Sequence, residues 1–181
     1  MLKKRELHES AELFELMTHP EVFPYVRQKA HSAEEFAFMT RQLMVEEHFG
    51  KTVSRTITDD WGKPIGVIAL FDVADGAGFL GTWIGKPYQG KGYNQKAKVE
   101  FFKELFFELG FQTVFMKVRK VNKQSQRAVE KLGYAIDAKE LHPALYAQVN
   151  SGDIPFELFK VDKDNFYLYL ATQTNEEEQA I

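Results

Sequence analysis

The stretch Trp83-Ile84-Gly85-Lys86-Pro87-Tyr88-Gln89-Gly90-Lys91-Gly92-Tyr93-Asn94 joins a predicted strand to a predicted helix. After Gly92, apolar residues recur at spacings of three and four, the period of an amphipathic helix: Ala97, Phe101, Phe102, Leu105, Phe106 and Leu109. The N-terminus of a helix carries backbone N–H groups without intrahelical acceptors, and it attracts anions. Because glycines let these groups approach a phosphate closely, the stretch predicts a pyrophosphate-binding loop.

The charge around this loop favours the same interpretation. No Asp or Glu occurs between Gly76 and Val99, although the whole chain has a net charge of −3. We expect Lys91 to help hold the pyrophosphate, and we interpret three other lysines as solvated surface charges: Lys86, Lys96 and Lys98. The loop matches neither the Walker A pattern nor the dinucleotide pattern Gly-x-Gly-x-x-Gly. A tight strand-to-helix turn with solvated lysines is the alternative.

Two motifs resemble those of a known family. The segment from Gln89 to Asn94 resembles the Gln/Arg-x-x-Gly-x-Gly/Ala signature of the Gcn5-related N-acetyltransferases (the GNAT superfamily), with Asn94 in place of the usual Gly or Ala. Asn122-Lys123-Gln124-Ser125, followed by Leu132-Gly133-Tyr134, resembles the Asn-x-x-Ser…Leu-Gly-Phe/Tyr segment of its ribosomal-protein-alanine acetyltransferase (RimJ/RimL-like) branch. The segment from His19 to Val26 is also similar to that branch.

The order of the predicted elements indicates an α+β fold. The resemblance implies the GNAT fold, which some schemes class as three-layer α/β, with a mixed, mostly antiparallel sheet of about seven strands and helices on both faces. Its fourth and fifth strands would splay apart to admit pantetheine. We predict helices over residues 10–17, 32–49, 92–109 and 125–132, and strands over 52–58, 65–73, 79–84, 113–118, 134–138, 156–161 and 166–171. Residues 142–152 are left unassigned.

Within these elements, Ser10 is expected to cap the first helix, and Ser32 with Glu35 forms a capping box for the second. The buried side of the second helix is expected to carry Phe36, Met39, Leu43 and Val45.

The resemblance also assigns residues to acetyl-CoA. The pyrophosphate would be bound by Gln89, Gly90, Lys91, Gly92, Tyr93 and Asn94, mainly through their backbone N–H groups. The backbone at Trp83 and Ile84 would pair with the amides of pantetheine, as an added strand does. Asn122 and Ser125 are the candidate catalytic pair: Asn122 would bond to the pantetheine arm, and Ser125 would protonate the CoA thiolate. The alternatives are a turn residue at Asn122 and a helix N-cap at Ser125, while Tyr134 is expected to be packed.

Composition limits the chemistry. The chain has no cysteine, which excludes disulfides, thiolate metal sites and a Cys nucleophile. No Ser-His-Asp arrangement is apparent, so direct transfer to a neutral amine is favoured over a covalent enzyme intermediate. The five histidines show no metal-ligand spacing, so no metal is expected. The strand before the loop carries no acid, and the general base stays open among Asp72, Glu47, Glu140 and His142, a water relay, or an amine that arrives neutral.

We therefore predict an N-acetyltransferase that moves the acetyl group of acetyl-CoA to a primary amine, either a protein N-terminus or a small amine. The alternative is a CoA-binding sensor or scaffold domain without catalytic activity. With 181 residues, one domain over residues 1–174 and a disordered polar tail over 175–181 are expected. No signal peptide and no membrane-length apolar run is found, so we expect a cytoplasmic protein. The small net charge gives no general attraction to nucleic acid or membranes, so neither is expected as a partner. We expect a monomer or a homodimer.

Overall fold

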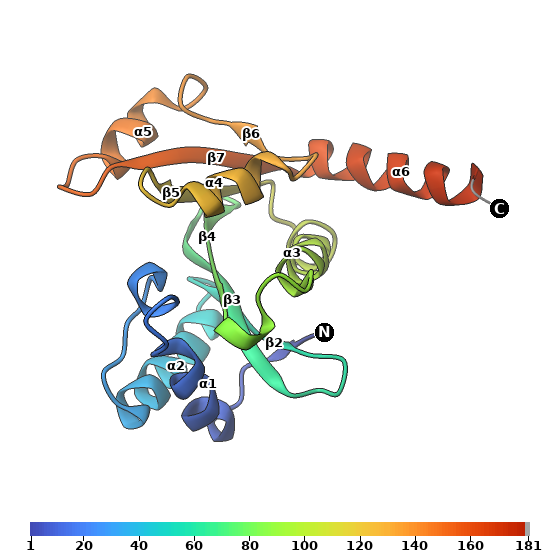
Figure 1. Cartoon of the computed structure of the whole chain (residues 1–181). Helices are drawn as coiled ribbons and strands as arrows, with labels where there is room; N and C mark the ends of the chain where they lie inside the picture. The colour runs from blue at the N-terminus through green and yellow to red at the C-terminus, as the bar shows by residue number, and fades with distance from the viewer. Residues whose placement is uncertain (180–181) are drawn as a thin grey trace. The chain divides into compact units, whose positions relative to one another are not determined.

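The computed structural model describes the backbone of residues 1–179 and the side chains of residues 1–173. These residues form two compact units: Met1–Asp75 with Leu80–Leu109 (unit 1), and Gly76–Phe79 with Gly110 onward (unit 2). The strands are β1 (Leu2–Lys4), β2 (Val53–Thr58), β3 (Pro64–Ala74), β4 (Ala77–Ile84), β5 (Thr113–Arg119), β6 (Ile136–Asp137) and β7 (Phe156–Asp162), labelled in Figure 1. They follow the order β1-β2-β3-β4-β5-β7-β6, and β4 belongs to both units. This mixed seven-stranded sheet with helices confirms the predicted fold class.

In unit 1, β2 and β3 form the predicted antiparallel hairpin, with Val53 opposite Leu70. The turn between them is held by Asp59, whose Oδ1 accepts the backbone N–H groups of Trp61 at 3.0 Å and Lys63 at 2.9 Å. Strand β1 pairs antiparallel with β2 and was not predicted, because three residues are too few to show an alternating pattern. Every residue of β2 is buried, so both faces of this part of the sheet are covered.

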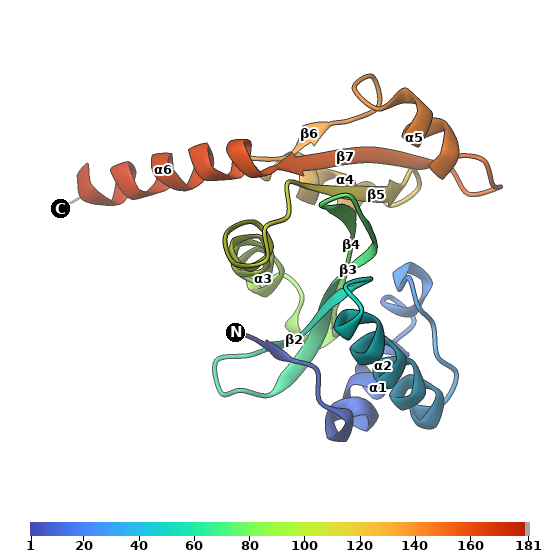
Figure 2. The same cartoon turned by 180° about the vertical axis from the view of Figure 1, so that it is seen from behind.

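The helices of unit 1 provide that cover. Helices α1 (Ser10–Met17) and α2 (Ala33–His48) lie on one side of the unit 1 strands, and α3 (Tyr93–Lys103) lies on the other (Figures 1 and 2). Leu13 and Met17 of α1 pack with Phe36 of α2 and with Val67 of β3 in one apolar cluster. Trp83, near the end of the strand that leads into the predicted phosphate loop, packs against the same cluster.

The start of α2 agrees with its predicted cap, and the start of α1 does not. Ser32 Oγ accepts the N–H of Glu35 at 3.0 Å, while the Glu35 carboxylate accepts the N–H of His31 at 2.7 Å. Helix α1 has Glu9 at its N-cap without a side-chain cap bond, so the predicted Ser10 cap is wrong. The predicted burial of Val45 is also wrong, because its side chain is 52% exposed on the outer face of α2.

Helix α3 continues into a short π-helical segment, η4 (Glu104–Glu108), in which the N–H of Leu109 reaches the carbonyl of Glu104 at 3.0 Å. Such a wider turn changes the direction of the side chains within a helix. Here Glu104 accepts a bond from Arg55 Nε at 2.9 Å, and Glu47 Oε1 lies 2.7 Å from Arg55 Nη1. The Arg55 side chain is only 7% exposed, so this ion-pair network ties the end of α3 to β2.

Removing one partner of this network should destabilise unit 1. In a Glu104→Ala variant the buried guanidinium of Arg55 keeps its charge and loses its main partner, and we expect a loss of about 3 kcal/mol in the free energy of unfolding. Urea denaturation followed by circular dichroism would measure it. Glu108→Ala, an exposed change on the same segment, is the control. Equal midpoints for both variants would contradict a stabilising role of the network.

In unit 2, β5 pairs with β7 in antiparallel fashion along its whole length, and β6 pairs with the opposite edge of β7. The parallel ladder between β4 and β5 comprises three pairs and ends with Phe79 opposite Phe115. The helices here are α4 (Lys123–Glu130), α5 (Pro143–Val149) and α6 (Lys163–Gln179). Splaying of β4 from β5 beyond this ladder stays a prediction of the resemblance.

Helix α6 replaces the predicted strand over residues 166–171, which is a correction. The run Phe166–Ala171 alternates aromatic and aliphatic residues, which is typical of a strand. In the structure it is helical, because Phe166 and Tyr169, three residues apart, both pack on the ring of Tyr134, at 5.1 and 4.7 Å between centroids. Helix α6 includes residues 175–179, whose fraying stays a prediction, and residues 180–181 lie outside the described part.

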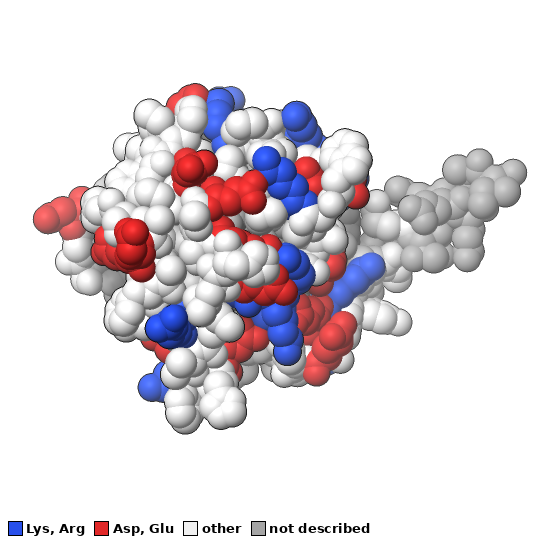
Figure 3. Space-filling model, turned by 90° about the horizontal axis from the view of Figure 1, so that it is seen from below, with Lys and Arg blue, Asp and Glu red and all other residues white. Residues whose placement is uncertain are grey.

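Charged side chains of both signs lie beside one another on the face drawn in Figure 3. Ion pairs in unit 1 join opposite charges in this way, for example Lys63 with Glu12 at 3.1 Å. None of the helices in the described part of the chain has the length and apolar character needed to cross a membrane.

Candidate active site

The loop between β4 and α3 is shaped by two glycines. A short 3-10 helix, η3 (Lys86–Tyr88), leaves β4, and the chain then passes through Gly90 at φ +75° and Gly92 at φ +82°. Both angles lie in the left-handed region, which glycine adopts without the steric cost that a Cβ brings. Gly92 is the N-cap residue of α3. The glycines therefore set the direction in which the first turn of α3 presents its N–H groups.

Those N–H groups are available for a ligand. Within residues 1–179, the structure records no acceptor for the backbone N–H groups of residues 90–95, and the first bond of α3 runs from Lys96 N to the Gly92 carbonyl at 3.1 Å. A Cβ placed on Gly90 or Gly92 would meet no atom within 4 Å, so the space beside them is open. Unpaired amides at a helix N-terminus are the groups that bind anions in many proteins, and anion binding by this loop stays a prediction.

Gln89 differs from the residues that follow it, because it is hydrogen-bonded within the loop. Its backbone N–H donates to the Lys86 carbonyl at 3.2 Å, and its side-chain Nε2 donates to the Ile84 carbonyl at 3.0 Å. Gln89 thus braces the loop against the end of β4. Contact of Gln89 with the pyrophosphate stays a prediction, although its own N–H is already bonded within the loop.

Two side chains anchor the first turn of α3, and neither contact was foreseen from the sequence. Thr82 Oγ1 on β4 donates to Asn94 Oδ1 at 3.3 Å, and the Tyr93 hydroxyl donates to Asp60 in the β2–β3 turn at 3.3 Å. The first contact gives a physical reason for Asn94 where the family signature has Gly or Ala: the amide fixes the helix start to the strand before the loop. An alternating strand pattern offers no signal for such a contact.

The charge near the loop is less uniform than the sequence suggests. Lys86 forms an ion pair with Glu21 at 2.7 Å, so an acid distant in the sequence comes to this end of the loop. The bond to Lys86 lowers the pKa of Glu21. Lys91 is exposed, with its ammonium 5.7 Å from the centre of the Tyr88 ring, and Lys96 is exposed as predicted. Contact of Lys91 with the pyrophosphate stays a prediction.

Lys98 is a correction to the predicted surface charges. It lies on α3 with only 6% of its surface exposed, among the buried residues Ala97, Phe101 and Phe102 of the same helix. Burial lowers its pKa to about 8. Lysine was assigned to the surface because it is rarely buried unless it is paired.

The backbone at the end of β4 lies close to β3. A Cβ on Gly66 of β3 would collide with the Trp83 carbonyl, which shows how closely the two strands approach. The Trp83 side chain is partly buried against the apolar cluster of α1 and α2. One backbone group of Ile84, its carbonyl, is taken by Gln89 Nε2. Pairing of the remaining groups of Trp83 and Ile84 with pantetheine stays a prediction.

In unit 2, the candidate catalytic pair lies at the start of α4. Asn122 is the N-cap, and its Oδ1 accepts the backbone N–H of Ser125 at 3.1 Å. The alternative that Ser125 caps this helix is therefore wrong, because Asn122 does so. Within the described residues, no hydrogen bond of the Ser125 hydroxyl is recorded, and Ser125 is half-buried. Its hydroxyl is available as a proton donor, and the catalytic roles of both residues stay predictions.

Gln126 holds this helix in place and was not singled out in the sequence. Its Nε2 donates to the carbonyls of Arg119 and Lys120, both at 2.9 Å, and its Oε1 accepts from Lys123 Nζ at 3.1 Å. The side chain is 8% exposed. Gln126 thus ties α4 to the end of β5 and positions Ser125, the residue before it.

The four candidates for a general base differ in their surroundings. Glu47 is bonded to Arg55, and Asp72 forms an ion pair with Arg27, so both acids already neutralise arginines. Glu140 is exposed, and the His142 ring packs edge-on against Phe115 at 5.0 Å between centroids. The structure therefore gives Glu47 and Asp72 structural partners, which weakens their case as bases.

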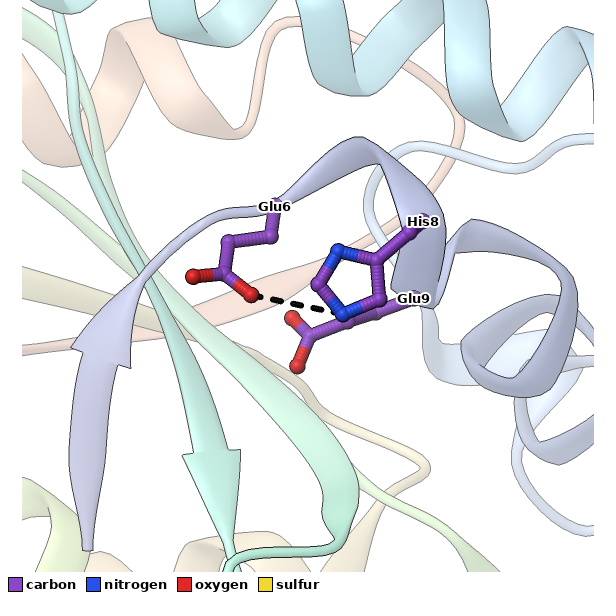
Figure 4. A group of neighbouring side chains, drawn as sticks. All are labelled: Glu6, His8 and Glu9. Carbon is purple, nitrogen blue, oxygen red and sulfur yellow. Dashed lines mark ion pairs between the residues drawn. The ribbon is translucent and has the colours of Figure 1, made fainter.

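One group of side chains at the N-terminus has the composition of a metal site. Ligand atoms of Glu6, His8 and Glu9 lie within 4.8 Å of one another. Figure 4 shows how the three side chains lie together. The ammonium of Lys3 lies 3.1 Å from Glu6 and 2.6 Å from Glu9, and Thr56 Oγ1 donates to Glu9 at 3.0 Å. These bonds raise the pKa of Lys3. A lysine thus supplies the positive charge that a cation would bring, and we interpret the group as an ion-pair network.

Comparison with known proteins identifies the family. The model of the acetyltransferase (GNAT) domain matches residues 1–135. The chain belongs to the GNAT family. The match contains the whole of the phosphate loop, together with Asn122, Ser125 and Tyr134. No curated protein matches the chain.

Solved GNAT structures share the fold. Apo FdhC, a nucleotide-linked sugar GNAT, has a TM-score of 0.76 at 18% identity, covering 96% of this chain and 92% of its own. Mycobacterium smegmatis RimJ in complex with CoA-disulfide has a TM-score of 0.73 at 12% identity, covering 95% and 88%. The ribosomal-protein-S5-alanine acetyltransferase of Vibrio fischeri has a TM-score of 0.71 at 15% identity, covering 91% and 93%. At these identities the likeness shows the fold alone.

The two roles considered for Asn122 can be separated by one substitution. In Asn122→Ser, the hydroxyl can still cap α4, because serine and asparagine are comparable N-caps, but the amide donor is lost. If Asn122 bonds to pantetheine, we expect acetyl-CoA affinity to fall about tenfold, the value of one hydrogen bond, with unchanged unfolding temperature. Calorimetric titration and thermal melts measure the two quantities. Equal affinity for the variant and the parent protein would leave Asn122 with the capping role alone.

Proposed function

We propose that this GNAT protein transfers the acetyl group of acetyl-CoA directly to a primary amine, on a protein N-terminus or a small molecule. The observation that carries the proposal is the row of N–H groups at residues 90–95, for which no protein acceptor is recorded within the described residues, beside the open space at Gly90 and Gly92. Such a row fits the diphosphate of coenzyme A, whose oxygens can each accept several charge-assisted bonds.

Each proposed step uses groups of this chain. The amides of residues 90–95 and the ammonium of Lys91 hold the diphosphate, so that the thioester is fixed for attack by the amine. The amine nitrogen forms a bond to the acetyl carbon while the carbon–sulfur bond breaks, so the nitrogen must lose one proton and the leaving thiolate must gain one. The Ser125 hydroxyl donates its proton to the sulfur, and the proton lost by the nitrogen returns through solvent to restore the hydroxyl. Two neighbours position Ser125: Asn122 accepts its backbone N–H, and Gln126 holds α4 against the end of β5.

Two kinds of acceptor are suggested by the proteins of similar fold. One of them is a ribosomal-protein-S5-alanine acetyltransferase, and another is a nucleotide-linked sugar GNAT. The sequence similarity to the ribosomal-protein-alanine branch, at residues 122–134, favours a protein N-terminus. We therefore place N-terminal peptides first among the acceptors to be tested and small amines second.

Two measurements test the proposal. Acetyl-CoA should raise the unfolding temperature, since a ligand that binds the native state stabilises it by RT ln(1 + [L]/Kd). No shift at millimolar acetyl-CoA would contradict the proposal. Release of free thiol across a panel of N-terminal peptides, polyamines and amino sugars then separates an enzyme from a CoA-binding scaffold. Binding without thiol release from any acceptor would favour the scaffold.

A further inference from the structure

Lys98 is a buried cation for which the described residues provide no counter-ion. Only 6% of its surface is exposed, and neither a hydrogen bond nor an ion pair of its ammonium is recorded within residues 1–173. The Nζ atom itself is not among the fully buried side-chain atoms that lack a hydrogen bond, so the stem is packed in the core while the ammonium reaches solvent. An ammonium placed in this way is accessible to an anionic ligand that binds beside the helix.

The geometry of α3 allows the Lys98 side chain to reach toward the phosphate loop. Lys98 follows Asn94 by four residues, so the two side chains lie on the same face of the helix, one turn apart. Side chains on a helix lean toward its N-terminus, and a lysine side chain is about as long as one helical turn of 5.4 Å. The ammonium of Lys98 can therefore reach the level of Asn94, at the end of the helix where the unpaired amides lie.

Asn94 adds a donor on that face. Its Oδ1 accepts from Thr82, so its Nδ2 group points away from that contact, and no acceptor of Nδ2 is recorded within the described part of the chain. Backbone amides, the Asn94 amide and the Lys98 ammonium are all donors without acceptors. An anion with several oxygens can accept hydrogen bonds from all three kinds of donor at this end of the helix.

Other charged groups near α3 do not pair with Lys98. Strands β1 and β3 and the segment η4 pack against α3, and β4, which carries no charged residue, contacts it through Thr82. Lys3 is bonded to Glu6 and Glu9, Asp72 to Arg27 and Glu104 to Arg55, while Lys4 and Glu108 are exposed. On α3 itself, Glu100 accepts the N–H of Leu2 at 3.1 Å and is exposed, as are Lys96 and Lys103. Burial is the cause of the low pKa of Lys98, about 8.

We propose that the Lys98 ammonium, together with the Asn94 amide, binds the diphosphate of the acyl-CoA substrate from the buried side of α3. The proposal rests on the proposed function and adds to it a cationic ligand that the backbone loop does not provide. It also explains why a lysine occupies a position whose neighbours on the helix are apolar.

The test compares two ligands and two variants. Lys98→Met keeps the length and apolar stem of the side chain and removes its charge, and Lys96→Met removes an exposed charge of the same helix as a control. For acetyl-CoA, we expect Lys98→Met to weaken binding about 10- to 100-fold, the range for a charge-assisted bond, and Lys96→Met less than threefold. S-acetylpantetheine lacks the diphosphate, so Lys98→Met should leave its affinity unchanged. Equal weakening for both ligands, or none for acetyl-CoA, would overturn the proposal.

Stability and pH provide independent readouts. Because methionine keeps the packed apolar stem, we expect ligand-free Lys98→Met to unfold at about the temperature of the parent protein; a marked decrease would assign Lys98 to the core and overturn the proposal. A bound diphosphate favours protonated Lys98 and raises its pKa above the free value of about 8. Acetyl-CoA affinity of the parent protein should therefore fall as the pH rises through 8, and the fall should be absent in Lys98→Met. A parent protein that does not bind acetyl-CoA overturns the proposed function as well, whereas equal binding by parent and variant overturns only the role of Lys98.

Discussion

Replacement of Gly92 by glutamate is expected to abolish acetyl-CoA binding. Gly92 has φ +82° and open space beside it, so the new side chain would extend into the region faced by the free amides. Its carboxylate would compete for those amides and repel the diphosphate, and the left-handed backbone would add about 1–2 kcal/mol of strain. We expect a loss of affinity of at least about 100-fold, equivalent to two charge-assisted bonds. Calorimetric titration with acetyl-CoA measures it.

Gly50→Glu is the matched control for this experiment. Gly50 lies in unit 1 after α2, has φ +69°, and also has no atom within 4 Å of a built Cβ. The control therefore introduces the same side chain and comparable backbone strain away from the phosphate loop. We expect it to bind acetyl-CoA as the parent protein does. If the two variants bound equally well, the anion site would have to lie elsewhere.

A Ser125→Ala variant should turn over about 100-fold more slowly while its affinity for acetyl-CoA stays within twofold. Proton transfer by a positioned group contributes about 10²- to 10⁴-fold to a rate, and the lower end applies where water can substitute. Because no bond of the Ser125 hydroxyl to the described protein is recorded, its removal should not change the unfolding temperature. Steady-state thiol release, with acetyl-CoA binding measured separately, distinguishes kcat from affinity.

The control for the proton donor is Ser151→Ala. Ser151 is an exposed serine of the same unit, and its hydroxyl donates to the Gln148 carbonyl at 2.8 Å at the end of α5. We expect this variant to retain full turnover. A Ser125→Ala enzyme with unchanged kcat would assign the protonation of the thiolate to another group, and one that lost affinity for acetyl-CoA would indicate a role of Ser125 in binding.

Local patterns were sufficient for most of the fold. The hairpin of β2 and β3 follows from alternation and from Asp59, and α2 follows from Ser32 and Glu35, since these signals act over a few residues. The errors occur where distant contacts decide. Helix α6 was predicted as a strand because its packing on Tyr134 depends on residues far away in the chain, and β1 exists through its pairing with β2.

In the candidate site, too, local patterns predicted some features, while contacts between distant residues were missed. The glycine pattern correctly indicated a turn with free amides before α3, because its geometry is encoded within a few residues. The contacts of Asn94 with Thr82 and of Lys86 with Glu21 join separate elements and have no local signal. Lys98 was misassigned since a lysine next to apolar residues is usually solvated. A cation at a core position of an amphipathic helix is the signal that could have identified it.

Helix α3 is fastened at both ends, by Arg55 with Glu104 at one and by Asp60 and Thr82 at the other. Its first turn therefore keeps its conformation before any substrate arrives. The conformational entropy of this turn is lost when the chain folds, so the binding of acetyl-CoA does not have to reduce it further. The free energy of the contacts with acetyl-CoA then contributes fully to affinity. Association with acetyl-CoA also need not wait for a rearrangement of this turn.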